Sequence, residues 1–315
     1  MSLTIGVDIG GTKVLGGVVD ADGKVVAQTR RATPAHDVRL TRDRIIEVIT
    51  ELAAAHPVDA AGIGAAGWID ASRAIVQFAP NLAWRDERLR DHIAEQVDLP
   101  IVVENDANAA AWAEFRFGAA HDVDSSIVML TIGTGIGGGI IISGELIRGA
   151  HGIAAELGHV VAVPDGHSCG CGRRGCLEQY ASGSALVRFA QLAAKDDPST
   201  AEALLDRVGG DPDAIDGMDV TAAARVGDRA ALGAFSEVGF WLGQGLADLV
   251  QVLDPQVFVV GGGVIEAGEL LLDPTRAAFT EALAQRGRLP VGEVRGAVLG
   301  NLAGVVGAAD LARRR

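Results

Sequence analysis

Residues 5–20 read IGVDIGGTKVLGGVVD, and residues 130–144 read LTIGTGIGGGIIISG. Each stretch is an apolar run, a glycine-rich turn and a second apolar run, which predicts two strands joined by a tight turn. The shared plan suggests two related α/β halves, although patterns this short do not prove a duplication. The length of 315 residues fits about two domains.

Predicted strands and helices alternate along the first third of the chain, as in an α/β fold. Strands, several of them running into glycine turns, are predicted at 3–11, 14–20, 24–31, 60–67, 101–106, 256–264 and 296–300. Helices are predicted at 39–55, 86–97, 107–117 and 301–314, and most of 182–254 is expected to be helical. Residues 151–180, rich in Gly, Cys and His, are expected to be irregular.

Charge and composition exclude several classes of protein. The net charge of −14, from 27 basic and 41 acidic residues, argues against non-specific nucleic-acid binding. No apolar run approaches the ~18 residues of a membrane helix, and no basic segment of a secretory signal precedes Asp8. Three cysteines within eight residues do not suit a disulfide framework. We therefore expect a cytoplasmic protein without a nucleic-acid or membrane partner.

Two segments match the dinucleotide fingerprint G-x-G-x-x-G, at 62–67 and 133–138. That fingerprint requires a helix directly after the glycines, because the pyrophosphate is bound at the helix N-terminus. Both matches are instead followed by segments that resemble strands, which argues against NAD binding. The chain also lacks the P-loop pattern G-x-x-x-x-G-K-[ST].

The glycine turns offer another way to hold phosphates. A tight turn between strands exposes successive N–H groups as an anion-binding nest, and two such turns facing each other could clamp a triphosphate. Asp8 supplies a carboxylate for Mg²⁺, directly or through water. The alternative is that these are plain turns. The predicted ligand is a nucleoside triphosphate with Mg²⁺, and the candidate nucleotide-binding residues are Asp8, Gly10, Gly11, Thr12, Lys13, Thr134, Gly135, Gly261, Gly262 and Gly263.

Cys169, Cys171 and Cys176 lie on one short glycine-rich loop. Clustered cysteines of this kind indicate a metal more often than a disulfide, and a structural zinc site needs four tetrahedral N or S ligands. His159 and His167 are both candidates for the fourth ligand. The alternatives are free buried cysteines or a transient cysteine pair. We expect a structural Zn²⁺ that fixes the loop.

Several polar residues suit phosphoryl transfer to a hydroxyl group, which needs a held acceptor and a proton acceptor. Asp106 is at the end of a predicted strand, where a carboxylate could act as general base or as the N-cap of the next helix. Asn105 can both donate and accept hydrogen bonds. Glu156 and His159 are three residues apart, so one helical turn would place them on one face. Glu178 is either a ligand-binding residue or an exposed charge.

Five segments together resemble the ROK family of bacterial sugar kinases and related repressors. They are DIGGTK at 8–13, END at 104–106, TIGTGIGGG at 131–139, AELGH at 155–159 and CGCGRRGCLE at 169–178. The resemblance spans the chain from Asp8 to the closing helix. It implies a two-domain actin-like ATPase (ribonuclease H-like) α/β fold with a cleft between the domains. The expected domains are 1–108 plus 301–315, including a closing helix that returns to this half, and 109–300 with the zinc loop.

Within the family the chain is most similar to the ATP-dependent bacterial glucokinases. The resemblance implies phosphorylation of glucose to glucose 6-phosphate with Asp106 as general base. It also selects His159 as the fourth zinc ligand, with the other ring nitrogen toward the sugar. The implied substrate-binding residues are Gly67, Asn81, Asn105, Asp106, Glu156, His159 and Glu178. One departure from the family pattern is Ala155, where many relatives have glycine. Because family members are often dimers or tetramers, the resemblance also implies a homo-oligomer.

Alternative functions stay open at this point. Another ROK kinase could act on N-acetylmannosamine, N-acetylglucosamine or fructose, or use polyphosphate as donor, because hexoses differ at only one or two hydroxyls. A sugar-sensing regulator is less favoured. ROK repressors carry a helix-turn-helix segment ahead of the sugar domain, whereas here the first predicted strand starts at Leu3.

Overall fold

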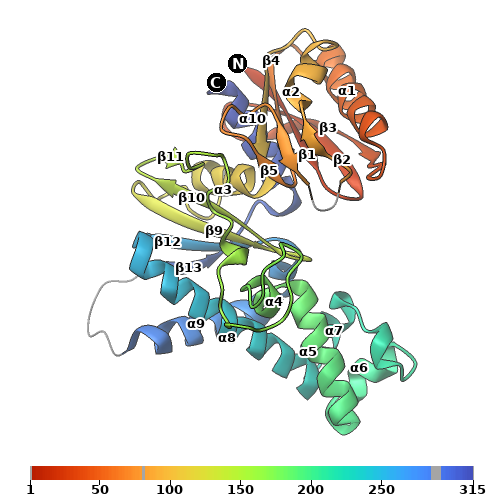
Figure 1. The fold of residues 1–315 in the computed structure, drawn as a ribbon, viewed down its shortest axis with the longest axis vertical. Coiled ribbons are helices and arrows are strands. Elements are labelled where there is room, and N and C mark those ends of the chain that lie inside the picture. Colours follow the sequence, from red (N-terminus) through yellow and green to blue (C-terminus); the bar gives the residue numbers. More distant parts are fainter. Residues whose placement is uncertain (1, 80–81, 285–291, 315) are drawn as a thin grey trace. The chain divides into compact units, whose positions relative to one another are not determined.

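A computed structural model of the chain describes residues 2–79, 82–284 and 292–314 (Figure 1). The chain divides into two compact units. Unit 1 consists of Met1–Met129, Gly138–Ala155 and Val298–Arg315, and unit 2 of Leu130–Gly137 and Glu156–Ala297. These compact units have other bounds than the expected domains, 1–108 plus 301–315 and 109–300, which remain a prediction.

Unit 1 is built on a five-stranded sheet with the order β3-β2-β1-β4-β8. Its strands are β1 (Leu3–Ile9), β2 (Lys13–Val19), β3 (Val25–Ala32), β4 (Val58–Ala65) and β8 (Ile101–Asn105). β1 runs antiparallel to β2 and parallel to β4, and β4 runs parallel to β8. The predicted hairpin at the N-terminus and the strands near 60 and 101 are therefore confirmed.

Helices cover both faces of this sheet, which explains its apolar strands. On one face lies α1 (Val38–Ala55), whose Ile45, Val48 and Ile49 are fully buried. On the other lies α10 (Ala303–Arg313), beside α3 (Asp106–Phe117). The expectation that the closing helix packs on the N-terminal half is confirmed (Figure 1).

Glycines let α10 approach the sheet at backbone distance. A Cβ atom on Gly6 of β1 would lie 1.8 Å from the Val305 carbonyl oxygen, and one on Gly62 of β4 would lie 1.9 Å from that of Ala308. No side chain fits in this space. Gly62 of the fingerprint-like segment 62–67 therefore has a packing role.

The segment between β4 and β8 forms short strands and one helix. A small three-stranded sheet has the order β5-β6-β7 and consists of β5 (Trp68–Ile69), β6 (Val76–Phe78) and β7 (Arg85–Glu87). The predicted helix 86–97 is wrong at its start, because 85–87 pair with β6 and α2 is limited to Leu89–Ala94. The strand β5 directly follows the glycines of 62–67, which removes the context for a dinucleotide site.

A second five-stranded sheet has the order β11-β10-β9-β12-β13. Its strands are β9 (Ser126–Ile132), β10 (Ile136–Ile142), β11 (Glu145–Leu146), β12 (Val257–Gly261) and β13 (Glu293–Gly296). In both five-stranded sheets the strands lie in the order third, second, first, fourth, fifth, counted along the chain within each sheet. The shared plan of the two predicted hairpins is therefore confirmed. The strand predicted at 296–300 ends at Gly296, because Gly300 already begins a 3₁₀ turn, η6 (Gly300–Leu302).

Apart from β12, β13 and the adjoining ends of β9 and β10, unit 2 is largely helical, as expected for 182–254. Its helices are α4 (Glu178–Ala181), α5 (Gly183–Asp196), α6 (Glu202–Arg207), α7 (Gly217–Arg225), α8 (Arg229–Leu253) and α9 (Glu269–Leu283). The 3₁₀ turns are η1 (Leu157–His159), η2 (Pro198–Thr200), η3 (Pro212–Ala214) and η4 (Gly263–Ala267). α8 packs against α9, where Gly239 and Gly243 bring the two backbones close.

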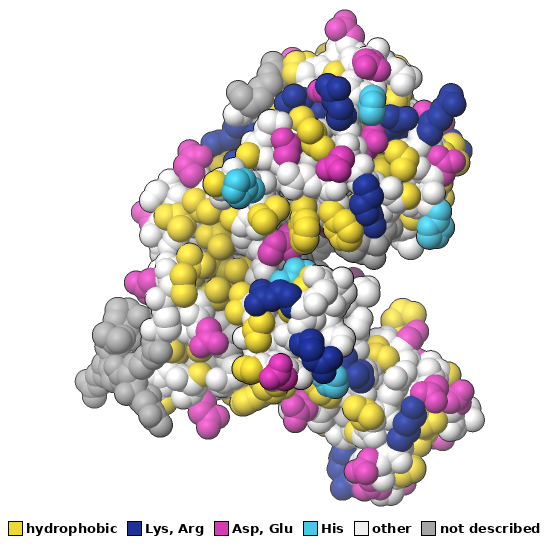
Figure 2. Space-filling view, in the orientation of Figure 1, with side chains coloured by type: hydrophobic (Ala, Val, Ile, Leu, Met, Phe, Trp, Pro, Cys, Tyr) yellow, Lys and Arg dark blue, Asp and Glu magenta, His cyan; other side chains and the backbone are white. Residues whose placement is uncertain are grey.

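On the face drawn in Figure 2, acidic and basic side chains are interspersed. None of the helices in the described ranges has the length and apolar character needed to cross a membrane.

Candidate active site

In unit 1 the polar residues of the motifs meet at one edge of the sheet. β1, β4 and β8 are parallel, and their register pairs Asp8 with Gly64 and Gly64 with Glu104. Their carboxyl ends therefore lie together, the usual place for ligands in open α/β sheets. This arrangement brings Asp8 near Asp106, which begins α3 directly after β8.

Asp106 is not the N-cap of α3. That position belongs to Asn105, whose side chain accepts a hydrogen bond from the Asn108 N–H at 2.9 Å. Asp106 is the first residue of the helix, and its Oδ1 accepts from the Ala107 N–H at 2.9 Å. Burial raises the pKa of Asp106 above its ordinary value. The carboxyl group thus has the position and the raised basicity of a proton acceptor.

Asn105 also joins α3 to a second predicted site residue. Its Nδ2 donates to the Gly67 carbonyl at 3.0 Å. Gly67 has a φ of +129°, and a Cβ there would lie 2.2 Å from the Phe78 carbonyl oxygen. The structure therefore brings Asn105 and Gly67 together, whereas Asn81 lies outside the described residues.

Asp8 is the second carboxylate of this edge. Burial and the negative charge of Asp106 raise the pKa of Asp8 to about 7, while Lys13 acts in the opposite direction. A Cβ on Gly304, in the first turn of α10, would lie 2.9 Å from the Asp8 Cγ. A helix N-terminus favours a negative group beside it. The Asp8 carboxylate is an oxygen ligand of the kind that Mg²⁺ prefers.

The first glycine loop is a tight turn with free donors. The Gly10 N–H donates to the Lys13 carbonyl at 3.0 Å. Thr33 donates its hydroxyl to the Gly10 carbonyl at 2.8 Å and its N–H to the Thr12 carbonyl at 3.1 Å. Within the described ranges, no group accepts a hydrogen bond from the N–H of Gly11 or Thr12. These two donors are available to an anion.

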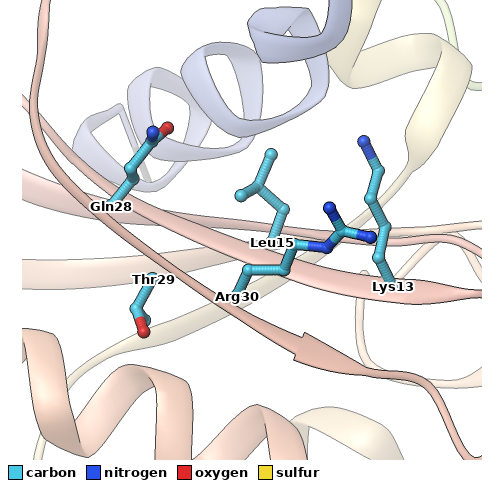
Figure 3. A pocket seen from close by; sticks show the side chains of 5 residues that line it. All are labelled: Lys13, Leu15, Gln28, Thr29 and Arg30. Atoms are coloured by element: carbon cyan, nitrogen blue, oxygen red, sulfur yellow. The ribbon is translucent and has the colours of Figure 1, made fainter.

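Lys13 points into a cavity of about 330 Å³ on the outer part of the sheet (Figure 3). Arg30 and Gln28 of β3 and Leu15 of β2 line it as well. Within the described ranges neither Lys13 nor Arg30 forms an ion pair, although the half-buried Lys13 acts electrostatically on Asp8. Both cations could therefore interact with a bound anion.

The second glycine loop, in unit 2, has the same character. The Gly133 N–H donates to the Gly135 carbonyl at 2.9 Å, and the Ile136 N–H donates to Glu178 Oε2 at 3.0 Å. The N–H groups of Thr134 and Gly135 have no acceptor in the part of the chain that the structure describes. A Cβ on Gly135 would lie 2.2 Å from Glu178 Oε2, so a side chain there would displace the Glu178 carboxylate from its present position.

Two residues that the sequence analysis missed hold this loop. The Gly183 N–H donates to the Gly133 carbonyl at 2.8 Å, and the Ser184 hydroxyl donates to the Thr134 carbonyl at 2.7 Å. Both residues lie at the start of α5. The only signal in the sequence is a run of small residues, SGS at 182–184, before a helix.

The third predicted glycine segment, 261–263, is next to the second loop. Gly262 follows β12 with a φ of +85°, and a Cβ there would lie 2.4 Å from the Ile132 carbonyl oxygen. A Cβ on Gly183 would lie 2.7 Å from the Gly133 carbonyl oxygen and 3.1 Å from Val264 Cγ2. The structure therefore gathers these segments in unit 2.

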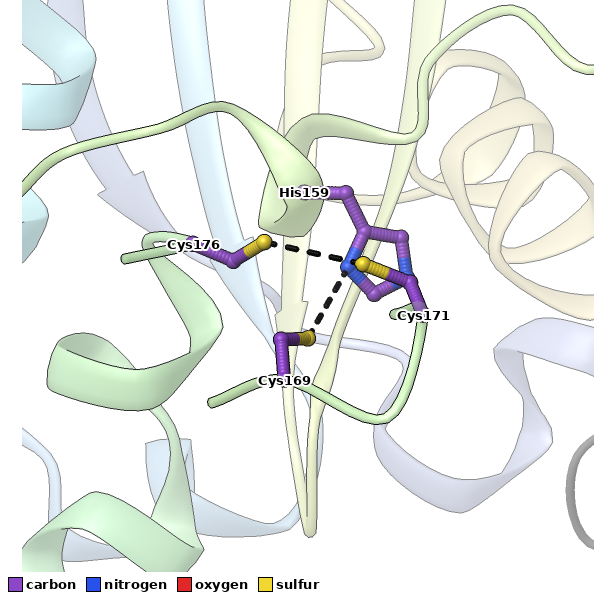
Figure 4. Close-up of side chains that lie close together, drawn as sticks. All are labelled: His159, Cys169, Cys171 and Cys176. Carbon is purple, nitrogen blue, oxygen red and sulfur yellow. Dashed lines mark hydrogen bonds between the residues drawn. The ribbon is translucent and has the colours of Figure 1, made fainter. Parts of the chain in front are cut away.

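The four predicted metal ligands form one cluster in unit 2 (Figure 4). The donor atoms of His159, Cys169, Cys171 and Cys176 all lie within 4.8 Å of one another. The Cys171 and Cys176 sulfurs are 3.7 Å apart, and Cys169 Sγ is 3.6 Å from His159 Nδ1. Tetrahedral zinc with its usual bond lengths requires about 3.8 Å between sulfurs and about 3.6 Å between sulfur and nitrogen.

The donor set therefore fits zinc, and it includes His159 rather than His167. The His167 ring instead packs against Tyr180, with centroids 5.3 Å apart. Burial and the neighbouring thiols raise the pKa of Cys176 to about 12, and burial is also the largest of the effects that raise the pKa of Cys169. A bound dication would stabilise the thiolates that this environment otherwise disfavours.

The remaining polar residues surround the cluster. Glu156 precedes η1, and its Oε2 lies 3.9 Å from His159 Nε2, which confirms the expected shared face. Glu178 is half-buried, with Oε1 3.7 Å from Cys169 Sγ, so it is not an exposed surface charge. Ala155 has a φ of +69°, which lies in the left-handed region of backbone conformation that favours glycine.

Comparisons with known proteins agree with these motifs. Residues 4–315 match the ROK family. The glucokinase of Streptomyces coelicolor is 48% identical over 313 residues, which are 99% of this chain and 98% of that protein. Among solved structures, the ROK family glucokinase from Streptomyces griseus, in complex with glucose and AMPPNP, is 50% identical, with a TM-score of 0.91 over 100% of both chains.

A more distant solved structure extends the likeness. The ROK hexokinase from Thermus thermophilus is 33% identical, with a TM-score of 0.83 over 99% of this chain and 98% of that one. The family match covers nearly every residue, and the repeated strand order agrees with the family architecture. This chain therefore belongs to the ROK family and has its two-domain actin-like ATPase fold.

Proposed function

We propose that this chain is a glucokinase that transfers the γ-phosphoryl group of ATP to the 6-hydroxyl of glucose. The observation that carries the proposal is the full-length match at 50% identity to a glucokinase that binds glucose and AMPPNP. The free N–H groups and the carboxyl groups described above supply the chemistry that such a transfer needs.

Each glycine loop offers two N–H groups to the phosphates of the nucleotide. Gly11 and Thr12 supply them in unit 1, and Thr134 and Gly135 supply them in unit 2. Lys13 adds a cation that is not ion-paired with any residue in the described ranges, and segment 261–263 brings backbone close to the second loop. Phosphoryl transfer depends mainly on such positioning and charge neutralisation.

Asp106 is the proposed general base. It would accept the proton of the 6-hydroxyl as the phosphoryl group is transferred, and its raised pKa improves its strength as a base. Asp8 would hold Mg²⁺, directly or through water, and the ion would neutralise charge on the phosphates. The charge of a nearby dication would also favour the ionised form of Asp8.

Each unit carries residues that suit hydrogen bonding to a sugar. Asn105 and Gly67, with Asn81, are the proposed contacts from unit 1. Glu156, His159 and Glu178 are the proposed contacts from unit 2. Each of the two glutamate carboxylates can accept hydrogen bonds from two hydroxyls. This pairing of acceptors with adjacent hydroxyls is what discriminates one hexose from another.

The proposed zinc is structural. Its ligands are His159, Cys169, Cys171 and Cys176, and four protein ligands leave no open position for chemistry. The ion would hold the loop that presents Glu156 and Glu178. A homo-oligomeric state and a cytoplasmic location are further predictions, which rest on the family resemblance and on the composition.

The test is an ADP-release assay with MgATP and a panel of glucose, mannose, fructose, N-acetylglucosamine and N-acetylmannosamine. We expect a kcat/KM for glucose at least tenfold above that of every other sugar. A preference for an N-acetyl sugar would refute the substrate and leave the phosphoryl transfer. Turnover with polyphosphate but not with ATP would refute the donor. Sugar binding without turnover would indicate a sensor.

A further inference from the structure

We infer that Thr33 and Ser184 are positioning residues that orient the two phosphate-binding loops, one residue for each loop. Neither belongs to a glycine motif, and both lie on segments that follow the loops in the chain. The inference rests on the proposed binding of MgATP, and it assigns two side chains to that function.

The geometry of the peptide bond carries the argument. In a trans peptide the carbonyl of one residue and the N–H of the next point in opposite directions, and the unit is rigid. A hydrogen bond that fixes the carbonyl therefore fixes the direction of the following N–H. A donor that binds a loop carbonyl from one side therefore orients the N–H of the next residue toward the opposite side of the loop.

The first loop shows this arrangement once. The Thr33 hydroxyl donates to the Gly10 carbonyl at 2.8 Å, and the N–H on the other side of that peptide belongs to Gly11. The N–H of Gly11 is one of the two free donors of the loop. Thr33 also donates its own N–H to the Thr12 carbonyl at 3.1 Å, which holds the end of the turn.

The second loop shows the arrangement twice. The Gly183 N–H fixes the Gly133 carbonyl, and the opposing N–H belongs to Thr134. The Ser184 hydroxyl fixes the Thr134 carbonyl at 2.7 Å, and the opposing N–H belongs to Gly135. Both free donors of this loop therefore come from peptides whose carbonyls are anchored by the start of α5.

A phosphate needs these N–H groups to point at it before it binds. Without the anchor, the peptide unit can rotate, and binding must then restrict that rotation. Because the anchors contact carbonyls rather than the ligand, their loss should weaken nucleotide binding while glucose binding stays unchanged. This selectivity separates an orienting role from a general effect on folding.

The experiment measures binding of MgAMPPNP and of glucose, each by calorimetry, in Thr33→Val and Ser184→Ala. Loss of one hydrogen bond of this kind corresponds to roughly a fivefold weaker affinity for MgAMPPNP. The two sites share no partner, so the double variant should lose about 25-fold. Glucose affinity should stay within about twofold of the original value.

Two further pairs of variants sharpen the test. Thr33→Ser and Ser184→Thr keep a hydroxyl and should restore nucleotide affinity. Ser236→Ala and Thr221→Val each remove a hydroxyl that donates to a helical carbonyl, at 3.0 and 2.9 Å, and neither residue bonds to a loop carbonyl. These matched controls should bind MgAMPPNP as the unmodified chain does.

Unchanged MgAMPPNP affinity in both Thr33→Val and Ser184→Ala would overturn the inference. An equal loss of glucose and nucleotide affinity, or failure of the hydroxyl-retaining variants to restore binding, would also overturn it. A chain that phosphorylates no sugar, yet binds MgAMPPNP with this dependence on the two hydroxyls, would refute the proposed function and support the inference.

Discussion

Asp106→Asn is the most direct test of the proposed chemistry, because it removes the proton acceptor and little else. The asparagine Oδ1 can still accept from the Ala107 N–H, and Asn105 still caps α3. The variant also removes the negative charge that raises the pKa of Asp8. We therefore expect an unchanged or higher melting temperature, with glucose binding retained.

The expected loss is kinetic. Removal of a general base costs roughly 10²- to 10⁴-fold in kcat, which corresponds to about 3–5 kcal/mol of transition-state stabilisation. The assay is ADP release at saturating glucose and MgATP, together with a calorimetric Kd for glucose. A kcat within about threefold of the original value would refute Asp106 as the base.

The pH profile gives a second readout of the same residue. A base must be deprotonated, so kcat/KM should fall as the pH falls through the raised pKa of Asp106. This fall should occur above the ordinary carboxyl value of 3.8. The residual activity of Asp106→Asn should lack that dependence, and an identical pH profile in the variant would contradict the assignment.

Three other predictions concern the structure around the site. A chelator, or Cys171→Ser, should release zinc and lower the melting temperature. Because Glu178 joins the cluster to the second loop, the KM for both glucose and MgATP should also rise. An unchanged melting temperature and an unchanged KM would exclude a structural metal. Glu114→Gln should lower the free energy of unfolding, measured in urea, by about 3 kcal/mol. The buried Glu114 carboxylate accepts hydrogen bonds from three backbone N–H groups. In the variant the side-chain NH₂ group would face the Ala119 N–H, and two donors would then oppose each other. The raised pKa of Asp8, about 7, means that in Mg²⁺-free buffer the folded chain binds one more proton at this residue than the unfolded chain does. The folded chain therefore loses stability as the pH rises toward 7, and the melting temperature of Asp8→Asn should increase relative to that of the original chain between pH 5 and pH 8. A difference in melting temperature that stays constant over this range would contradict the raised pKa.

The parts of the site that could be predicted from the sequence are those in which neighbouring residues share one task. The loop 8–13 and the cysteine loop 169–176 each place their chemical groups within a few positions. Local geometry then follows from glycine and from the metal donor types. For the same reason, Glu156 and His159 could be paired from their spacing.

The residues that the sequence did not reveal act across long separations. Thr33 contacts a carbonyl 23 positions away, and Ser184 contacts one 50 positions away. Hydroxyl residues in loops are common, so composition alone does not mark either one. The wrong start of the helix at 86 has a similar cause, because pairing with β6 overrides the local helical preference.

The high glycine content illustrates how one residue type serves two purposes that only the fold distinguishes. At Gly135 the absence of a Cβ makes room for the Glu178 carboxylate beside a phosphate loop, whereas at Gly6 and Gly62 it lets α10 contact the sheet. These packing glycines hold the helix whose first turn adjoins Asp8. The close packing of α10 therefore brings the first turn of that helix, at Gly304, next to the proposed magnesium ligand Asp8, so glycines that bind no ligand still contribute to the surroundings of the site.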